Sequence, residues 1–343
     1  MVRTECLCAL LLMVLSTLIG CSAGGTMDIH VYVQRGELQE VRRLLSTPEA
    51  KGRMLEAFDD SGRTPLMIAA ASLSVDKRML KLLLDAGAQV NQTSRGTLAG
   101  GKSALAMALS AGNVEKVKLL LDRGADIRYQ RDGGYDAVID AVHGRNIARD
   151  ATLVDLLKLV IEQGASVSGR TKYCESGLRV SSHWGRFDAV RLLLVAGANE
   201  KELGWSPLMH AIALGSVADV ESALQAKPNL EQRDSWKRTP WLLAIQTGSI
   251  DKAQLLLAYG ADREARGKLG QPALFYAIPK AHLDMLRWLL DLGLDPELTD
   301  EFGKTPLMEA AESGEASVVD VLLTHGVEID HEREYQQTAL SDA

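Results

Sequence analysis

Apolar positions in this chain recur at a long, regular spacing. Leu208, Trp241, Leu274, Leu307 and Leu340 are separated by 33 residues each time, and each opens a short apolar segment. A second apolar segment follows each one before the next period begins. A fixed period of this length is typical of a repeat array, in which each unit buries its apolar face only by stacking on its neighbours.

Each unit is predicted to contain two short helices. The first starts at a Thr-Pro or Ser-Pro pair, because the hydroxyl can accept from a free amide of the first turn and Pro needs no donor there. These starts are Thr64-Pro65-Leu66, Ser206-Pro207-Leu208, Thr239-Pro240-Trp241 and Thr305-Pro306-Leu307. The second helix carries a Leu triplet and stops at a glycine, where a left-handed residue ends a helix with little strain. The closing glycines are Gly87, Gly124, Gly164, Gly197, Gly260, Gly293 and Gly326.

The Thr-Pro-Leu signature and the paired helices resemble the ankyrin repeat. The resemblance implies an all-α ankyrin-repeat solenoid with short β-hairpin-like fingers, and a chain that binds proteins. Laid along the sequence, the pattern predicts an N-terminal cap repeat at 27–58, eight repeats at 59–334 and a C-terminal cap stub at 335–343. The repeat at 204–233 is atypical, because Lys227-Pro228 stands where a closing glycine is expected.

Residues 1–20 are predicted to be a signal peptide rather than part of the repeats. The apolar run from Leu7 to Ile19 is too short to span a bilayer. Leu18-Ile19-Gly20-Cys21 resembles the bacterial lipobox. The resemblance implies a lipidated Cys21, carrying fatty acid such as palmitate, with 21–26 as a tether. Since Ser22 follows, it also implies an outer-membrane lipoprotein that faces the periplasm. An ordinary secretory signal, with Cys21 incidental, is the alternative.

Candidate chemistry is sparse. Seven His are scattered without metal-ligand spacing, and after removal of the leader only Cys21 and Cys174 remain. Ser181-Ser182-His183 has no oxyanion loop beside it, and Gly100-Gly101-Lys102-Ser103 lacks the upstream glycine of a phosphate loop. We therefore expect no catalytic residue, no metal and no cofactor, and Cys174 is interpreted as a free structural thiol, with a redox or intermolecular role as the alternative.

The finger residue three positions before each helix start is the main candidate for partner binding. In the last six repeats this residue is apolar or aromatic, and stacking would align the six as one stripe: Tyr173, Leu203, Trp236, Leu269, Phe302 and Tyr335. The resemblance implies a partner contact here, since this position commonly contacts partners in ankyrin proteins. Trp184, Trp205 and Leu214 are predicted to extend the stripe onto the concave face. The alternative is that these bulky side chains only cover the turns.

Charge narrows the class of partner. The net charge of −7 argues against nucleic acid and anionic headgroups, and favours a basic or mixed-charge protein, with the lipid anchor as the membrane contact. A tethered periplasmic binder is similar to immunity lipoproteins that neutralise phospholipase effectors of type VI secretion, which implies that the stripe masks a toxin's active-site entrance. The alternative is a structural adaptor or scaffold in the bacterial envelope, linked to oxidative-stress defence.

Overall fold

The computed structural model describes residues 28–96, 100–144 and 151–331. In this part the chain forms 18 α-helices, three short 3-10 helices and two isolated β-bridges, with no sheet. The all-α solenoid predicted from the 33-residue period is therefore confirmed. The predicted signal peptide at 1–20, Cys21, the tether at 21–26, Tyr335 and the stub at 335–343 lie outside the described residues.

The N-terminal segment contains three helices rather than the expected pair. They are α2 (Ile29–Gln34), α3 (Leu38–Leu44) and α4 (Pro48–Met54). The third begins at Thr47-Pro48, where the Thr47 hydroxyl accepts from the Ala50 amide at 3.3 Å. The same helix-start chemistry that marks the repeats thus produces an extra helix here.

Eight helix pairs follow along the chain. They are α5 (Pro65–Ala71) with α6 (Lys77–Asp85), α7 (Ala104–Ser110) with α8 (Val114–Asp122), α9 (Ala137–Val142) with α10 (Leu153–Glu162), α11 (Gly177–His183) with α12 (Phe187–Val195), α13 (Pro207–Leu214) with α14 (Val217–Gln225), α15 (Pro240–Thr247) with α16 (Ile250–Ala258), η3 (Ala273–Tyr276) with α17 (Leu283–Asp291), and α18 (Pro306–Glu312) with α19 (Ala316–Thr324). Two further 3-10 turns lie in the fingers, η1 (Glu200–Leu203) and η2 (Lys268–Gly270).

The predicted helix starts have the expected capping geometry. Each hydroxyl accepts from the amide three residues later, in the pairs Thr64–Met67 (3.4 Å), Ser206–Met209 (3.2 Å), Thr239–Leu242 (3.4 Å) and Thr305–Met308 (3.2 Å). At the corresponding position of the seventh pair stands Pro272, which has no hydroxyl to offer, and no side chain caps η3. The absence of this cap agrees with the shortening of that first helix to a single 3-10 segment.

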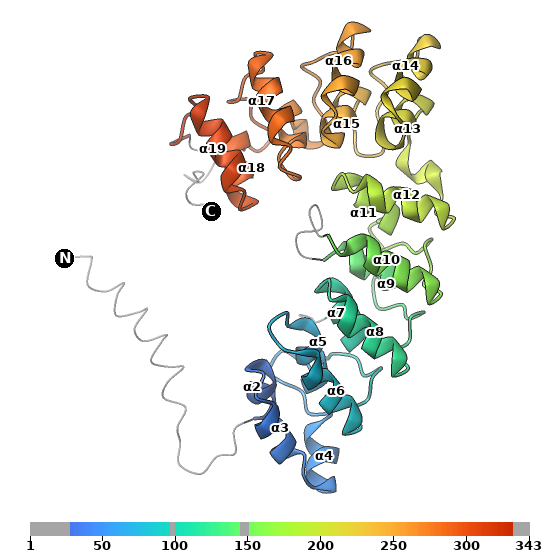
Figure 1. Cartoon of the computed structure of the whole chain (residues 1–343), viewed down its shortest axis with the longest axis vertical. Coiled ribbons are helices and arrows are strands. Elements are labelled where there is room, and N and C mark those ends of the chain that lie inside the picture. The colour runs from blue at the N-terminus through green and yellow to red at the C-terminus, as the bar shows by residue number, and fades with distance from the viewer. Residues whose placement is uncertain (1–27, 97–99, 145–150, 332–343) are drawn as a thin grey trace, which may run out of the picture.

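The stack of repeats changes direction once. In Figure 1 the pairs from α2 to α12 run along one side of the molecule, and those from α13 to α19 run across its end, so the chain forms an arch. The buried apolar side chains divide at the same place. One cluster extends from Ile29 to Leu203, and a second extends from Leu208 to Val327. Trp205 and Leu214 pack against both, so they connect the two cores.

The finger at this turn is short. Nine residues separate the closing Gly197 from the helix start at Ser206, whereas twelve separate Gly293 from Thr305. The segment between them forms the 3-10 turn η1 instead of a closed hairpin. Because three residues are missing, the chain enters α13 before it can extend as far as the other fingers do. The change of direction therefore coincides with a shortened connection.

In two places a lysine links one repeat to the preceding one, and the repeat after the turn has no such lysine. Lys116, the third residue of α8, donates to the carbonyls of Ala69 (2.7 Å) and Ser72 (2.5 Å) at the end of α5. Lys252, the third residue of α16, caps the end of α13 in the same way. The third residue of α14 is Asp219, which accepts from Ser216 in a capping box instead. An acceptor cannot cap carbonyls, so α14 gives α11 no such link.

Candidate partner-binding surface on the finger edge

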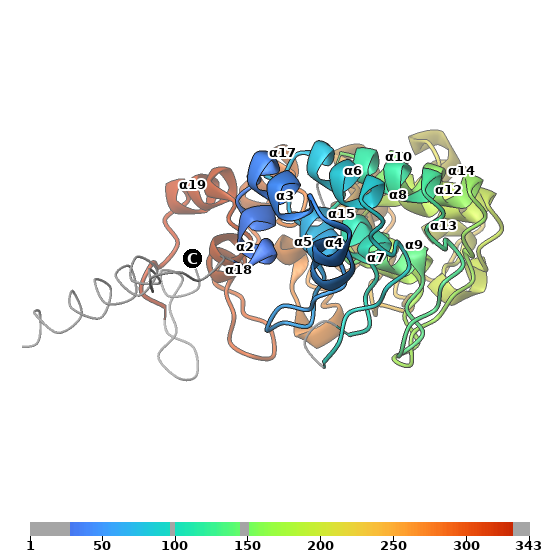
Figure 2. The ribbon, with the colours of Figure 1, turned by 90° about the horizontal axis from the view of Figure 1, so that it is seen from below.

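The fingers lie along one edge of the arch, which is the lower edge in Figure 2. An aspartate closes three of them: Oδ1 of Asp59, Asp234 and Asp300 each accepts from the amides two and four residues later, at 2.7–3.0 Å. Backbone hydrogen bonds join some neighbouring fingers, as between the Leu269 carbonyl and the Glu301 amide at 2.9 Å. Hydrogen bonds within and between the fingers therefore hold this edge as one surface rather than as a set of independent loops.

Three of the predicted stripe residues are well exposed on this edge. Tyr173 is 66% exposed, Phe302 62% and Leu269 40%. Apolar side chains of this size cost free energy in water, so their exposure on fixed turns favours a binding role over simple coverage. Contact with a partner remains a prediction for all of them.

Leu203 does not belong to an exposed stripe, and this part of the sequence-based prediction is wrong. Its side chain is fully buried, and it is part of the first hydrophobic core. The shortened finger explains the burial, because η1 holds Leu203 inward against α11 rather than out on a hairpin. Its carbonyl still joins the next finger by accepting from the Ser235 amide at 2.9 Å.

Trp236 and Trp184 both lie against the His183 ring. The centroid of that ring is 4.3 Å from the Trp236 centroid and 5.2 Å from the Trp184 centroid. Trp236 is half-buried, and its indole N–H donates to the Arg179 carbonyl at 3.0 Å. Trp184 is 37% exposed. We call His183, Trp184 and Trp236, with Arg179 and Lys268 beside them, the corner cluster.

Trp205 and Leu214 mainly fill the junction between the two cores. Both are half-buried, and the Trp205 ring lies 6.3 Å from Phe187 and 6.5 Å from His210 between centroids. Packing across the turn covers part of each side chain, but both keep partial exposure, so their extension of the patch stays a prediction.

The corner cluster is held by hydrogen bonds that pass over a whole repeat. Arg238 is buried, and its Nη1 and Nη2 donate to the carbonyl and the hydroxyl of Ser182, both at 2.7 Å. The Gln246 amide donates to the His183 carbonyl at 2.7 Å, and Lys280 Nζ donates to the Gly185 carbonyl at 3.3 Å. The end of α11, which α14 does not cap, is thus capped by side chains from the repeats that follow the turn.

Positive side chains lie over the aromatic rings of this edge. The distances to the ring centroid are 4.1 Å for Arg95 over Phe58, 4.0 Å for Arg131 over Tyr135, 5.1 Å for Lys172 over Tyr173, 5.5 Å for Arg179 over Trp236 and 4.7 Å for Lys268 over Trp236. Each geometry fits a cation–π contact. Several cations therefore gather on the finger edge of a chain whose net charge is −7, and composition gives no sign of this.

Burial and positively charged neighbours both lower the pKa of His183. Removal from water, followed by the charges of Arg238 and Lys268, lowers the pKa of its imidazole to about 4, while Asp234 opposes the shift. The ring is therefore neutral at pH 7, which suits its apolar contacts with the two indoles, tilted on Trp236 and edge-on to Trp184.

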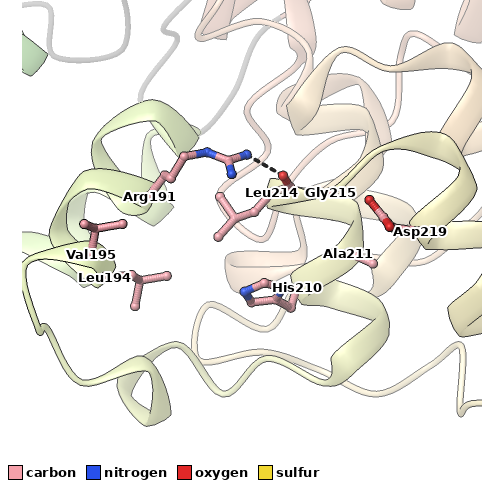
Figure 3. Close-up of a pocket in the computed structure, with 8 residues that line it drawn as sticks. All are labelled: Arg191, Leu194, Val195, His210, Ala211, Leu214, Gly215 and Asp219. Carbon is pink, nitrogen blue, oxygen red and sulfur yellow. Dashed lines mark hydrogen bonds between the residues drawn. The ribbon is translucent and has the colours of Figure 1, made fainter.

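A groove opens on the other side of the turn. It has a volume of about 490 Å³, and Figure 3 shows it between α12 and α13, with Arg191 hydrogen-bonded to the Leu214 carbonyl. Its lining is mostly apolar and includes Val195, which is 83% exposed. The groove exists because α12 and α14 diverge where the stack turns.

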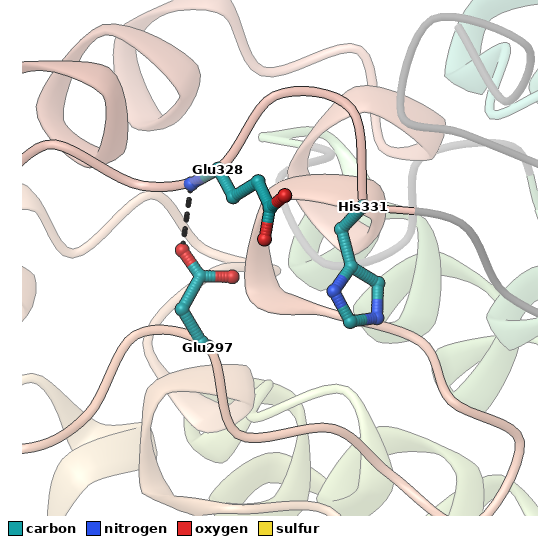
Figure 4. A group of neighbouring side chains, drawn as sticks. All are labelled: Glu297, Glu328 and His331. Atoms are coloured by element: carbon teal, nitrogen blue, oxygen red, sulfur yellow. Dashed lines mark hydrogen bonds between the residues drawn. The ribbon is translucent and has the colours of Figure 1, made fainter.

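Three side chains of metal-ligand type gather near the last described residues. Figure 4 shows Glu297, Glu328 and His331, whose ligand atoms lie within 4.8 Å of one another. The sequence spacing did not suggest this group. Glu297 already accepts from the Glu328 amide at 2.7 Å, and Glu56 and Glu231 accept from the amides of Gln89 and Asp262 in the same manner. Glu297 thus links neighbouring repeats by accepting from a backbone amide of the next repeat, as Glu56 and Glu231 do.

The other candidate motifs have structural roles. Ser181 is fully buried, and Ser182 binds Arg238 through its hydroxyl and carbonyl. Ser103 caps α7 by accepting from the Ala106 amide at 3.2 Å. Cys174 is exposed on its finger, at a left-handed φ of 60°.

Among the described residues, no helix combines the length and the apolar character needed to cross a bilayer. This finding does not extend to residues 1–27, where the leader is predicted.

The chain is similar to proteins built from ankyrin repeats. A Danio rerio protein named as a palmitoyltransferase is 35% identical over 89 residues, 26% of this chain and 13% of the relative. A B-cell lymphoma 3 protein homolog from Mus musculus is 25% identical over 252 residues, 61% of this chain and 54% of the relative. Inversin from Danio rerio is 32% identical over 101 residues, 29% of this chain and 9% of the relative. The chain thus spans 54% or less of the length of each.

The family model for ankyrin repeats matches three segments, at residues 70–150, 218–300 and 274–343. These segments cover more than half of the sequence and both arms of the arch. The matches agree with the helix pairs and the finger geometry described above, and the chain belongs to the ankyrin-repeat family.

Proposed function

We propose that this protein binds a protein partner, without catalysis, through the finger edge and the inner side of the arch. The ankyrin repeats imply protein binding as the general function. The observation that carries the proposed site is the exposure of Tyr173, Leu269 and Phe302 on turns that hydrogen bonds hold in place. Rigid turns bearing aromatic side chains lose little entropy when they bind, so a few such anchors provide most of the binding energy.

The proposed biological role is that of an immunity protein which occludes a cognate toxin, such as a phospholipase effector delivered by type VI secretion. Support comes from the lipobox-like Leu18-Ile19-Gly20-Cys21 and from the shape of the fold. A lipid anchor at Cys21 would hold the arch at the periplasmic face of the outer membrane, where such a toxin acts. The arch itself offers a concave surface that suits coverage of a whole domain.

Growth rescue tests this role. Cells that direct a toxin encoded next to this gene to the periplasm are expected to grow when they also express the full chain, and to die when they express a variant with Tyr173→Ser, Leu269→Ser and Phe302→Ser. A matched variant with Leu73→Ser and Ile329→Ser changes exposed apolar residues away from the stripe and should still rescue. If the full chain gives no rescue and no neighbouring toxin exists, the immunity role is excluded and an envelope scaffold becomes the better assignment.

A further inference from the structure

We propose that the partner presents an acidic, carboxylate-bearing protein segment to the corner cluster and to the finger of Tyr173. This inference rests on the proposed protein-binding function and specifies the chemistry of the partner at that site.

Three cations lie on this surface. Lys172 and Lys268 are exposed, and Arg179 is half-buried. In the part of the chain that the structure describes, none of the three forms an ion pair. All three lie over rings of the candidate surface, Lys172 over Tyr173 and the other two over Trp236. A carboxylate of a partner protein would therefore meet cations that lie on the candidate surface and that form no ion pair with the described residues.

Two of these cations lie against the same aromatic ring. Arg179 and Lys268 lie 5.5 Å and 4.7 Å from the Trp236 centroid, so the two charges are within about 10 Å of each other, about one Debye length at 0.1 M salt. Like charges at this separation repel each other. A carboxylate placed near both would relieve that repulsion and could make a charge-assisted hydrogen bond.

Two of the nearby carboxylates are already paired with other cations. Asp234 is buried against Arg238, with an Oδ2–Nη2 distance of 2.5 Å. The Glu202 side chain is 6% exposed and binds Arg170 at 2.7 Å. Glu301 remains exposed on the next finger, beyond Gly270. Lys172, Arg179 and Lys268 therefore have no ion-pair partner among the described residues, although the net charge of the chain is −7.

The lowered pKa of His183 agrees with this charge distribution, since Arg238 and Lys268 contribute to it after burial. The positive area is confined to a few side chains at the turn. A short acidic segment that also carries an aromatic or aliphatic residue fits this area better than nucleic acid, whose extended phosphate backbone the rest of the acidic chain would repel.

The test uses fluorescence polarisation of the full chain in detergent with three labelled probes: a decapeptide of alternating Glu and Tyr, its Lys-Tyr counterpart, and a thymidine decamer. We expect the Glu-Tyr peptide to bind about tenfold more tightly than the Lys-Tyr peptide at 50 mM salt, and this preference to shrink as salt rises. The double variant Lys172→Glu/Lys268→Glu should abolish the preference.

The control is Lys81→Glu/Lys118→Glu, which makes the same change of net charge on α6 and α8, and it should alter the affinity less than about twofold. The inference is overturned if the Lys-Tyr peptide binds as well as the Glu-Tyr peptide, if neither peptide binds, if both double variants weaken binding equally, or if the thymidine decamer binds most tightly. Any of these results would leave growth rescue unaffected, so failure of the acidic-partner inference is distinguishable from failure of the proposed function.

Discussion

Arg238 and Ser182 are 56 residues apart and joined by two hydrogen bonds of 2.7 Å, although a complete repeat lies between them in the sequence. In a straight solenoid each repeat contacts only its neighbours. This pair forms because the stack turns at α12 and α13, which brings the finger of α15 against the end of α11. The hydrogen bonds between Arg238 and Ser182 therefore depend on the same turn of the stack that brings the corner cluster together.

Loss of the Arg238 guanidinium is expected to destabilise the protein strongly. In Arg238→Ala, Asp234 would remain buried without its partner, and the α11 carbonyls would lose a cap. We expect a loss of about 3–5 kcal/mol in the free energy of unfolding, measured by urea denaturation. Arg63→Ala is the matched control: Arg63 pairs with Asp59 in the same finger geometry, but its side chain is 34% exposed, so the expected loss is about 1 kcal/mol or less. Equal losses would show that the bonds across the turn contribute nothing.

Leu203 and Phe302 occupy equivalent finger positions and are expected to respond in opposite ways. Leu203→Ala should cost about 2–5 kcal/mol, since it opens a cavity in a core where this side chain is fully buried. Phe302→Ser should change stability by less than about 0.5 kcal/mol, because the ring is 62% exposed, while it weakens partner capture. Thermal melting followed by circular dichroism measures both. A large loss for Phe302→Ser would mean that the finger ring is structural.

These two residues also show what could be predicted from the sequence. The Thr-Pro starts and the closing glycines predicted the helix pairs because capping and helix termination depend on local chemistry. Leu203 fits the same local pattern as Phe302, but its burial depends on the direction of stacking. The missing three residues between Gly197 and Ser206 were the available signal.

Contacts between distant repeats could not be found in this way. The hydrogen bond from Arg238 to Ser182 and the grouping of Glu297 with His331 need the three-dimensional path of the chain. Local charge also escaped prediction, since a net charge of −7 does not reveal that Lys172, Arg179 and Lys268 gather on one edge.

The protein is expected to lose stability in mild acid, because His183 binds a proton more readily in the unfolded chain than in the folded one. Its folded-state pKa of about 4 lies below the ordinary value of 6.5, so between these two pH values the unfolded chain takes up a proton that the folded chain excludes. The resulting loss, complete below pH 4, is about 1–3 kcal/mol. Urea denaturation at pH 7 and pH 4.5 should show a smaller difference for His183→Gln than for the natural chain. His210→Gln serves as control, since its side chain is 49% exposed, and should keep the full difference. An unchanged pH dependence in His183→Gln would refute the assignment.

Cys21→Ser is expected to release the protein from the membrane. A lipidated Cys21 would hold the chain through inserted acyl chains, each buried methylene contributing about 0.8 kcal/mol, whereas serine has no thiol to which the lipid could be attached. Cell fractionation followed by immunoblotting should move Cys21→Ser from the membrane pellet to the soluble fraction. Cys174→Ser is the matched control, because it also removes a thiol but lies on an exposed finger of the repeats, and it should stay in the pellet. If Cys21→Ser remains in the pellet after a high-salt wash, another feature of the chain must tether it, and the lipobox interpretation would lose its main consequence.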